Sequence, residues 1–205
     1  MTYDISKGIN ILIKRDNIFA LLVNQLGFIE KINRPLSFET LLKIIINQQL
    51  SNIVANTLFL RLKELVNRTG GFTPSNILNI DPDKIREVGI SYSKIDYIKN
   101  LSKEFINKPK FIEEWNKLDD EHAKIDIERL KGFGPWSSNI ILLFCLGRPN
   151  IFPAGDATLI KAYKNIYKKN LDKKLTAIEW SVPYRSILAL YFWKWVDNGM
   201  NELQK

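Results

Sequence analysis

A glycine-bracketed turn between two helical stretches constrains this chain more than any other feature of its sequence. Gly132 and Gly134 flank Phe133, and glycine lets a backbone turn tightly and approach a ligand without a Cβ in the way. Pro135 follows, and proline fits the first position of a helix because the N–H that it lacks would have no partner there. The pattern predicts a tight hairpin and then an apolar helix from Trp136 to about Leu146, with unbonded N–H groups at its start.

The first turn of that helix is suited to an anion. The leading N–H groups of a helix point outward and carry the positive end of its dipole, so they attract a phosphate. A Gly-x-Gly pair by itself is equally compatible with an ordinary corner between two helices. The turn therefore predicts a phosphate site only when it is read with its neighbours.

A carboxylate follows this helix after a short loop. The helix is roughly 20 Å long at about 1.5 Å per residue, and the loop from Arg148 to Gly155 can span about 26 Å when extended. Asp156 can therefore return to the hairpin end of the helix. Asp156 is also well placed to cap a helix from Ala157 to Asn170, and the two roles agree because a helix N-terminus stabilises negative charge.

Composition narrows the class of protein. At 205 residues the chain fits one domain or one compact two-lobed unit. The formal net charge of +8 suits a polyanionic partner. The single cysteine, Cys145, lies in an apolar run and is expected in the core, and it excludes an iron–sulfur cluster or a disulfide within one chain. The only histidine, His122, has no companion ligands and is expected on a helix surface.

Targeting signals are missing from the sequence. The N-terminus lacks the basic-then-apolar pattern of a signal peptide. Apolar runs all fall short of the roughly 18 residues that a membrane span needs. We therefore expect an intracellular protein, cytoplasmic and associated with the nucleoid, with no membrane partner.

Helical periodicity recurs along the chain, and no strand pattern competes with it. Hydroxyl or carboxylate residues precede several of the periodic stretches, where they predict helix N-caps. These residues are Ser37, Ser51, Asp81, Ser91 or Ser93, and Ser181. The sequence predicts an all-α fold of about ten helices.

Two further polar features stand out from the helical pattern. Gln48 and Gln49 lie at a tip between two apolar helices, where a solvated interhelical turn is the ordinary interpretation. Lys94, Lys99 and Lys103 share the predicted exposed face of one helix, which indicates diffuse attraction to phosphates at most.

The segment from Leu130 to Asp156 resembles the helix-hairpin-helix and following loop of the HhH-GPD DNA glycosylases. That family has leucine, any residue, glycine, a hydrophobic residue and glycine, then a helix, a Gly/Pro-containing loop and an aspartate. The resemblance covers about residues 10 to 200 and implies one HhH-GPD unit over residues 1–205. One lobe would span about 37–147 and the other 1–36 with 148–205, with a central cleft for DNA. The implied partner is double-stranded DNA containing damaged bases, bound by a monomer.

The resemblance also implies roles for single residues. Asp156 would be the catalytic carboxylate. Gln49, with Gln48 beside it, would be the wedge that fills the gap left by a flipped-out base. The hairpin would bind phosphate through Lys131, Gly132, Phe133, Gly134 and Pro135.

A monovalent cation, Na+ or K+, is the one ligand that the resemblance adds to the hairpin. It would be held by the backbone carbonyls of Glu128, Leu130 and Phe133. No other cofactor is implied as a requirement, and no iron–sulfur cluster.

Trp136 indicates which branch of the family the chain resembles. Bifunctional members, such as endonuclease III and 8-oxoguanine DNA glycosylase, have a nucleophilic lysine at this position, and tryptophan cannot form a Schiff base. The monofunctional 3-methyladenine DNA glycosylase II branch carries tryptophan there. That branch also has a C-terminal pattern that matches Trp180, the run Pro183-Tyr184-Arg185-Ser186, and Trp193.

The implied base pocket combines Trp136, Tyr184 and Ile140. An N-alkylated purine is cationic, and aromatic faces select it by cation–π attraction of about 0.5–2 kcal/mol. Tyr184 replaces a tryptophan of the best-known members, and Ile140 replaces a tyrosine, so this pocket is less electron-rich than theirs. Two alternatives stay open: a glycosylase for uracil, mismatched thymine or oxidised guanine, and a non-catalytic helix-hairpin-helix module that only grips DNA.

Overall fold

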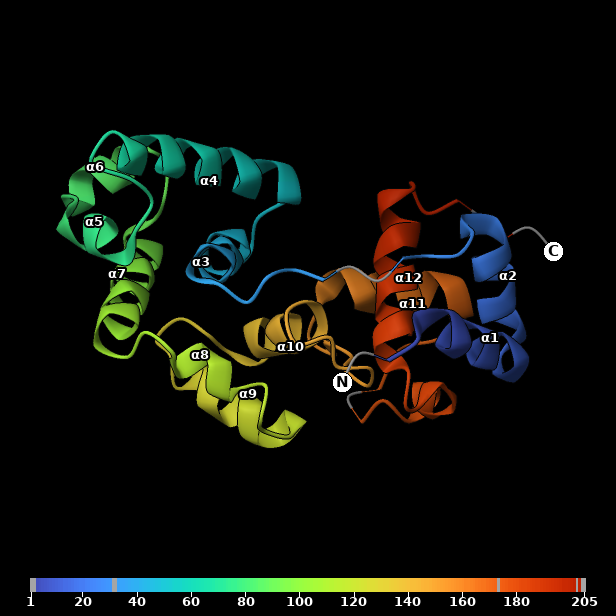
Figure 1. The fold of residues 1–205 in the computed structure, drawn as a ribbon. Coiled ribbons are helices and arrows are strands. Elements are labelled where there is room, and N and C mark those ends of the chain that lie inside the picture. The colour runs from blue at the N-terminus through green and yellow to red at the C-terminus, as the bar shows by residue number, and fades with distance from the viewer. Residues whose placement is uncertain (1–2, 31–32, 173, 202, 204–205) are drawn as a thin grey trace. The chain divides into compact units, whose positions relative to one another are not determined.

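The chain is helical throughout the part that the structure describes. The computed structural model describes residues 3–30, 33–172, 174–201 and 203. Within these ranges it has twelve α-helices, one 3-10 helix and no strand (Figure 1). The predicted all-α class is confirmed, with more helices than the expected ten because several of them are only one or two turns long.

The chain divides into two compact units. The central unit spans Arg34–Ile141, and the terminal unit combines Met1–Asn33 with Leu142–Lys205. The sequence placed these boundaries after residues 36 and 147. The second boundary lies earlier in the structure, because the last residues of the apolar helix after the hairpin pack with the C-terminal part of the chain.

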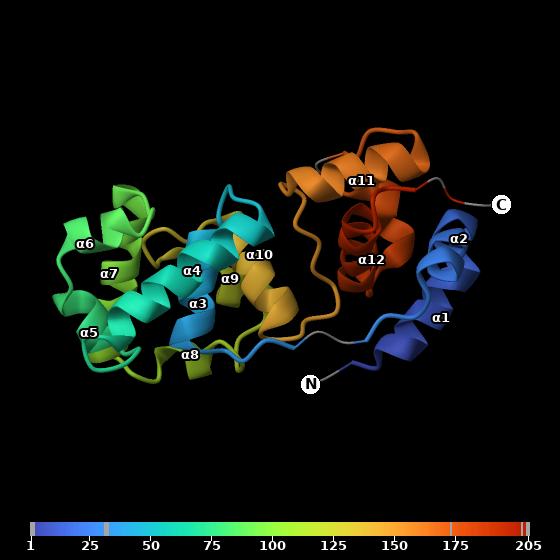
Figure 2. The same cartoon turned by 90° about the horizontal axis from the view of Figure 1, so that it is seen from above.

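The central unit is built around two long helices, α4 (Asn52–Asn67) and α7 (Tyr92–Asn107). Its helices are α3 (Phe38–Asn47), α4 (Asn52–Asn67), α5 (Pro74–Asn79), α6 (Pro82–Glu87), α7 (Tyr92–Asn107), α8 (Phe111–Glu114), α9 (Asp120–Glu128) and the greater part of α10 (Pro135–Phe144). α3 packs against both α4 and α7, and α5 and α6 pack against α7. Figure 2 shows α4 crossing α3 in this unit.

Side-chain caps start these helices where the sequence predicted them. The Ser37 hydroxyl accepts a hydrogen bond from the Thr40 N–H at 3.3 Å, and Ser51 and Ser91 cap α4 and α7 in the same way. Such caps satisfy backbone donors that have no partner inside the helix. Once started, each helix turns its apolar stripe inward. Phe38 packs edge-on against Phe105 at 5.1 Å between ring centroids, which joins α3 to α7.

The terminal unit is organised on one helix that is buried on most sides. α12 (Arg185–Asp197) packs against α2 (Asn17–Leu26) and α11 (Ala157–Tyr167), with contacts also to α1 (Ile5–Arg15) and the 3-10 helix η1 (Thr176–Ser181). In this unit Tyr191 meets the edge of Phe19 at 5.0 Å between ring centroids, and both are fully buried.

One predicted cap in this unit is wrong. Ser181 does not start α12; it ends η1 and is buried, with its hydroxyl donating to the Ile178 carbonyl at 2.6 Å. The Val182-Pro183 peptide bond is cis, and the helix begins only at Arg185. A serine hydroxyl bonds backward as readily as forward. The serine–proline pattern therefore placed the helix start three residues too early.

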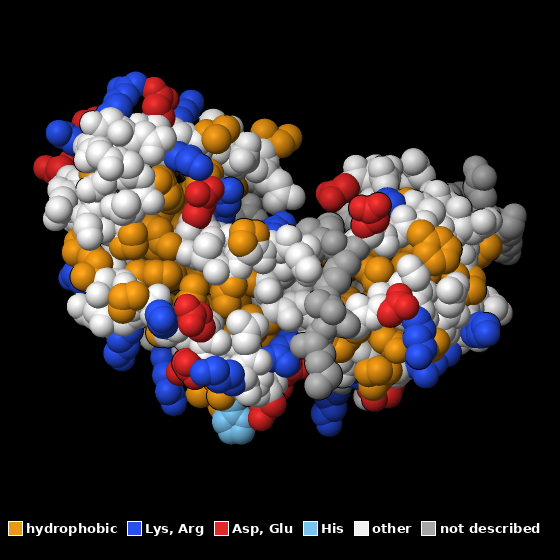
Figure 3. Space-filling view, in the orientation of Figure 1, with side chains coloured by type: hydrophobic (Ala, Val, Ile, Leu, Met, Phe, Trp, Pro, Cys, Tyr) orange, Lys and Arg blue, Asp and Glu red, His pale blue; other side chains and the backbone are white. Residues whose placement is uncertain are grey.

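The surface of the described residues carries both charges. On the central unit, basic and acidic side chains are interspersed on the face seen in Figure 3. His122 is exposed there, as predicted, and contacts the Asp119 carboxylate at 2.7 Å. Cys145 is half-buried. None of the described helices is long and apolar enough to cross a membrane.

Candidate functional site

The glycine turn of the sequence is a tight hairpin between α9 and α10. The Phe133 N–H donates to the Leu130 carbonyl at 3.0 Å, which closes the turn. Phe133 is buried, so it anchors the hairpin. α10 begins at Pro135, and the Ser138 N–H donates to the Gly134 carbonyl at 3.0 Å as the first bond of the helix. The predicted tight hairpin and the helix that follows it are both confirmed.

The two hairpin glycines are required for different reasons. Gly132 has φ +89°, and a Cβ there would lie 2.3 Å from Tyr97 Cγ and 2.8 Å from Tyr97 Cβ. Any side chain would therefore be strained and would collide with α7. Gly134 has nothing within 4 Å of an added Cβ. The structure thus needs Gly132 for packing, whereas Gly134 leaves open space at the start of α10.

Lys131 lies inside the hairpin but is paired within the protein. Its Nζ lies 2.7 Å from Asp96 Oδ2, and both side chains are about half-exposed. The sequence assigned this lysine to phosphate binding. In the structure its charge is paired with the Asp96 carboxylate, so backbone N–H groups are the better candidates for the predicted phosphate binding.

The two glutamines at the tip between α3 and α4 have separate environments. Gln48 is half-buried, and its Nε2 donates to the Gly132 carbonyl at 2.8 Å and to the Ser137 hydroxyl at 3.0 Å. Gln49 is exposed, with φ +58°. The sequence grouped both as a wedge, but only Gln49 faces outward.

Two lysines that the sequence placed on a solvated face are anchored at helix ends. Lys94 Nζ donates to the Ile46 and Gln48 carbonyls, both at 2.7 Å, and Lys99 Nζ donates to the Leu78 carbonyl at 2.9 Å. Burial lowers the pKa of Lys94 and of Lys99. A cation at a helix C-terminus complements the dipole and satisfies the last carbonyls. These lysines are therefore structural, and the prediction that they lie on a solvated face is wrong for both.

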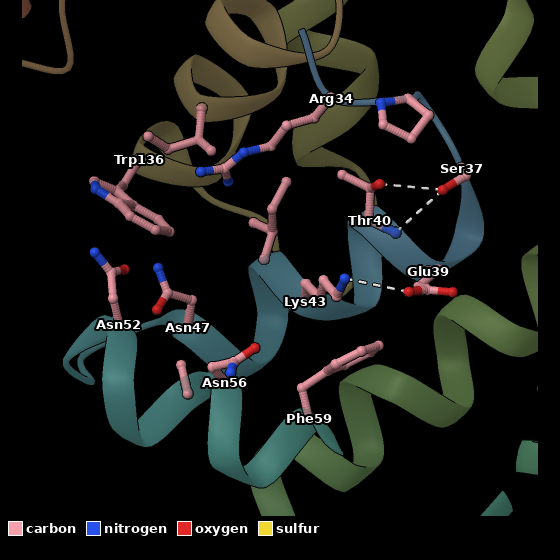
Figure 4. A pocket seen from close by; sticks show the side chains of 14 residues that line it. Arg34, Ser37, Glu39, Thr40, Lys43, Asn47, Asn52, Asn56, Phe59 and Trp136 are labelled. Atoms are coloured by element: carbon pink, nitrogen blue, oxygen red, sulfur yellow. Dashed lines mark hydrogen bonds and ion pairs between the residues drawn. The ribbon is translucent and has the colours of Figure 1, made fainter. Parts of the chain in front are cut away.

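A pocket of about 610 Å³ opens in the central unit between α3, α4 and α10 (Figure 4). Its lining residues come from these three helices and from the segment before α3. They are Arg34, Pro35, Ser37, Glu39, Thr40, Lys43, Ile44, Asn47, Asn52, Ala55, Asn56, Phe59, Trp136 and Ile140. Two predicted base-pocket residues, Trp136 and Ile140, are thus brought together in one wall.

The rest of this pocket is more polar than the sequence indicated. Figure 4 shows the amides of Asn47 and Asn52 directed toward the side on which Trp136 lies. Asn52 and Asn56 share a face of α4 because they are four residues apart. Their spacing was readable in the sequence, but nothing there connected them to Trp136.

An ion pair occupies the other end of the pocket. Glu39 lies 3.2 Å from Lys43 and 3.4 Å from Lys63, and Lys43 lies over the Phe59 ring at 4.4 Å from its centroid. Burial opposes the charge of Glu39, but hydrogen bonds and attraction from Lys43 and Lys63 outweigh it and lower the Glu39 pKa. Glu39 is therefore a charged partner of the lysines and is unsuited to proton transfer near neutral pH.

Asp156 caps α11 in the terminal unit, as the sequence predicted. Its Oδ1 accepts hydrogen bonds from the Thr158 N–H at 2.9 Å and the Leu159 N–H at 3.0 Å. The side chain is buried, with 9% of the residue exposed. These two bonds fix the orientation of the carboxylate, and α11 contributes the positive end of its dipole.

Tyr184 also belongs to the terminal unit. Its ring centroid lies 6.3 Å from that of Tyr3, and a Cβ on Gly8 of α1 would lie 3.0 Å from Tyr184 Cδ1. Trp136 and Ile140 therefore line the pocket of the central unit, while Asp156 and Tyr184 are presented by the terminal unit.

The implied cation would be bound by backbone carbonyls and not by side chains. Among the described residues, no group of three or more His, Cys, Asp or Glu side chains could hold a metal ion. The Leu130 carbonyl already accepts from the Phe133 N–H, but a carbonyl oxygen has two lone pairs. Oxygen donors from one tight turn suit a hard cation such as Na+ or K+, so the residues present are compatible with the implied ion.

Comparison with a family model identifies the same segment of the chain. The model of HhH-GPD superfamily base excision DNA repair proteins matches residues 42–181. This range includes the tip between α3 and α4, the hairpin and Asp156.

Individual proteins resemble the chain over most of its length. DNA-3-methyladenine glycosylase 1 of Schizosaccharomyces pombe is 29% identical, over 77% of this chain and 71% of the relative. A solved structure of the 3-methyladenine DNA glycosylase of that yeast with abasic DNA is similar with a TM-score of 0.83, at 27% identity, over 96% of this chain and 99% of that one. A 3-methyladenine DNA glycosylase from Archaeoglobus fulgidus is similar with a TM-score of 0.76, at 25% identity, over 97% and 71%.

Proposed function

Because the chain belongs to the HhH-GPD superfamily of base excision DNA repair proteins, we propose that it is a monofunctional DNA glycosylase for alkylated bases of the 3-methyladenine type. The observation that carries the proposal is the carboxylate of Asp156, held at the N-terminus of α11 by two backbone N–H groups. The substrate class is supported by the relatives from Schizosaccharomyces pombe and Archaeoglobus fulgidus, which are named for 3-methyladenine.

The proposed reaction is hydrolysis at the sugar. The bond between C1′ of the deoxyribose and the base nitrogen breaks, and its electrons leave with the base. An N-alkylated purine already carries a positive charge, so it departs as a neutral molecule without a general acid. The sugar becomes an oxocarbenium-like cation, which Asp156 stabilises as a nearby anion. Water adds to C1′ and passes its proton to Asp156 or to solvent, which leaves an abasic site.

Aromatic contact supports selection of a cationic base. Trp136 is half-buried in the wall of the pocket, beside Ile140. A cation over an indole face gains about 0.5–2 kcal/mol. Tyr184, in the terminal unit, is the second aromatic residue assigned to the base. With one tryptophan and one tyrosine, selection for cationic bases is expected to be modest.

The lack of strand cleavage follows from the side chains at the hairpin. Trp136 stands where a lyase would have its amine, and tryptophan cannot form an imine. The amine of Lys131 is paired with Asp96 at 2.7 Å. We expect an intact strand bearing an abasic site, and no adduct on treatment with borohydride. A borohydride-trapped adduct that disappears in Lys131→Ala would contradict the monofunctional assignment.

DNA binding rests on the hairpin. Gly134 leaves the N-terminus of α10 open, so backbone N–H groups there can meet a phosphate. The proposed cation at the Glu128, Leu130 and Phe133 carbonyls would add positive charge beside that phosphate. One chain contains the hairpin, the tip and Asp156, so the proposal needs only a monomer on double-stranded DNA with a damaged base.

Single-turnover assays test the proposed substrate. Duplexes containing 3-methyladenine, 7-methylguanine, hypoxanthine, uracil and 8-oxoguanine are incubated with excess protein, and the released base is measured. We expect the fastest release from the alkylated purines. Release of uracil or 8-oxoguanine alone would replace the substrate class, and binding without release from any duplex would indicate a module that only grips DNA.

A further inference from the structure

The side chain of Gln48 connects two segments that are far apart in the sequence. Gln48 follows the end of α3, and its Nε2 donates to the Gly132 carbonyl at 2.8 Å and to the Ser137 hydroxyl at 3.0 Å. Gly132 is the first hairpin glycine, and Ser137 lies in the first turn of α10. Both amide hydrogens of Gln48 are therefore used to hold the hairpin.

The backbone of Gln48 is held from a third direction. Lys94 of α7 donates from Nζ to the Gln48 carbonyl and to the Ile46 carbonyl, both at 2.7 Å. A lysine that bonds two carbonyls at a helix C-terminus fixes the point where the chain leaves that helix. The start of the tip is thus fixed to α7.

The hairpin is held by the same helix, α7. Tyr97 packs against Gly132 so closely that a Cβ on Gly132 would lie 2.3 Å from the tyrosine ring. Asp96 pairs with Lys131 at 2.7 Å. α7 therefore supports both the hairpin and the tip, and Gln48 joins the two directly. All of these contacts lie within the central unit.

In this arrangement, Gln49 is the residue that faces outward. It is exposed with φ +58°, and the Leu50 N–H donates to the Asn47 carbonyl at 3.2 Å to close the turn around it. A left-handed conformation is unfavourable for a residue with a Cβ. The turn keeps it because the residue on each side is tied down.

We propose that Gln48 is a positioning residue that fixes the wedge Gln49 relative to the phosphate-binding hairpin. The inference rests on the proposed glycosylase function, and it separates the two glutamines that the sequence treated as one wedge. Phosphate contacts set the position of a protein along the DNA but carry no information about the base. With Gln48 in place, binding of the phosphate by the hairpin also sets where Gln49 enters the DNA duplex.

The physical gain is preorganisation. A wedge on a loose turn has to be ordered each time that a base is flipped, and this ordering weakens the interaction. A flipped base also leaves an unstacked gap that costs a few kcal/mol unless it is filled. A fixed Gln49 fills the gap without that additional ordering. The benefit is largest where the base pair is strong, because flipping is hardest there.

The test replaces Gln48 with glutamate. Gln48→Glu keeps the size of the side chain but places an acceptor against the Gly132 carbonyl, so that hydrogen bond is lost. We expect single-turnover base release to slow by roughly tenfold on a well-paired duplex, the scale of one or two hydrogen bonds, and by about twofold or less where the lesion is mispaired. Gln25→Glu, on the exposed face of α2, is the matched control and should behave like the wild type.

The double variant distinguishes positioning from direct contact. If Gln48 acts through Gln49, then Gln48→Glu combined with Gln49→Ala releases base no more than about twofold more slowly than Gln49→Ala alone. Multiplicative losses in the double variant would show that Gln48 acts by itself, and the inference would be wrong. A loss for Gln48→Glu that is equal on paired and mispaired duplexes would also overturn it, because a protein that is merely less stable loses activity on both.

A flipping measurement separates this inference from the proposed function. A 2-aminopurine placed beside an abasic analogue brightens when the stack around it opens, and it needs no base release. We expect Gln48→Glu to reduce the brightening that the wild type produces. If the wild type brightens the probe but releases no base, the proposed function fails. The positioning role is then still tested by comparing the brightening that the wild type and Gln48→Glu produce. A wild type that does neither overturns both.

Discussion

Two helices of this protein begin in opposite ways. α10 begins behind Gly134, which has no side chain with which to cap it, and an added Cβ there would meet nothing within 4 Å. α11 begins behind Asp156, whose carboxylate accepts hydrogen bonds from two backbone N–H groups. Both N-termini favour negative charge. The protein supplies that charge itself at α11, and under the proposed function a DNA phosphate supplies it at α10.

This contrast matches the two anions of the proposed reaction. The start of α10, where Gly134 has no side chain and open space around it, is suited in the proposed reaction to a DNA phosphate, which arrives from outside. The capped start of α11 holds a permanent carboxylate, which a developing sugar cation requires. Changes at the two N-termini should therefore affect different steps: base release at α11 and DNA binding at α10.

The largest expected effect is on base release. Asp156→Asn should slow single-turnover release by on the order of a hundredfold or more, the scale of a charge-stabilising group. Asparagine caps a helix about as well as aspartate, so affinity for DNA and the melting temperature should change little. A release rate equal to that of the wild type would remove Asp156 from the catalytic role.

The next effect is on stability and compares the two hairpin glycines. Gly132→Ala should destabilise the fold by roughly 2–4 kcal/mol, because the residue has φ +89° and its Cβ would collide with Tyr97. For a chain of this size that lowers Tm by about 5–15 °C.

Gly134→Ala is the matched control for that change. It should alter stability by less than about 1 kcal/mol, because the space around Gly134 is open. Thermal unfolding followed by circular dichroism measures both variants. Equal melting temperatures would mean that the packing of Tyr97 on the hairpin is not as described.

A smaller effect is expected on DNA binding. Gly134→Asp puts a carboxylate at the open N-terminus of α10, where it would cap the helix and repel a phosphate. Affinity should fall by roughly tenfold for damaged and undamaged duplex alike, because backbone contacts carry no sequence information. Fluorescence anisotropy on the two duplexes measures this. Loss confined to the damaged duplex would argue against phosphate binding at the hairpin.

The smallest effect concerns the cap of α11 itself. Asp156→Ala removes both the charge and the cap, and should cost about 1 kcal/mol of stability, or about 2–4 °C in Tm. Asp156→Asn should cost only about a few tenths of a kcal/mol of stability, because asparagine also caps the helix. If alanine and asparagine melt together, the two hydrogen bonds to the Thr158 and Leu159 N–H groups contribute nothing to stability.

The features predicted correctly from the sequence are local. Ser37 bonds to the N–H three residues later, and Asp156 bonds to those two and three residues later. The hairpin is equally local, because its bond joins Leu130 to Phe133. Such patterns act within one turn of chain, so residue type and spacing are enough to indicate them. Ser181 shows the limit, since its hydroxyl turned back to Ile178.

The features missed are contacts between distant segments. Lys94 was expected in solvent but reaches the carbonyl of Gln48, 46 residues away. Gln48 in turn reaches Gly132, 84 residues away. Asn52 lines the same pocket as Trp136 although they lie on different helices. Periodicity shows which face of a helix is apolar, but it does not show which polar groups meet once the helices have packed.

The sequence by itself determined the helical class, the hairpin, the helix that follows it and the capped position of Asp156. Each of these depends on backbone preferences and on hydrogen bonds closed within a few residues. Only the tertiary structure decided that Gln48 holds the hairpin while Gln49 faces outward, because the two glutamines are identical in chemistry and adjacent in the chain. Their difference comes from the packing of α3, α7 and the hairpin around one of them.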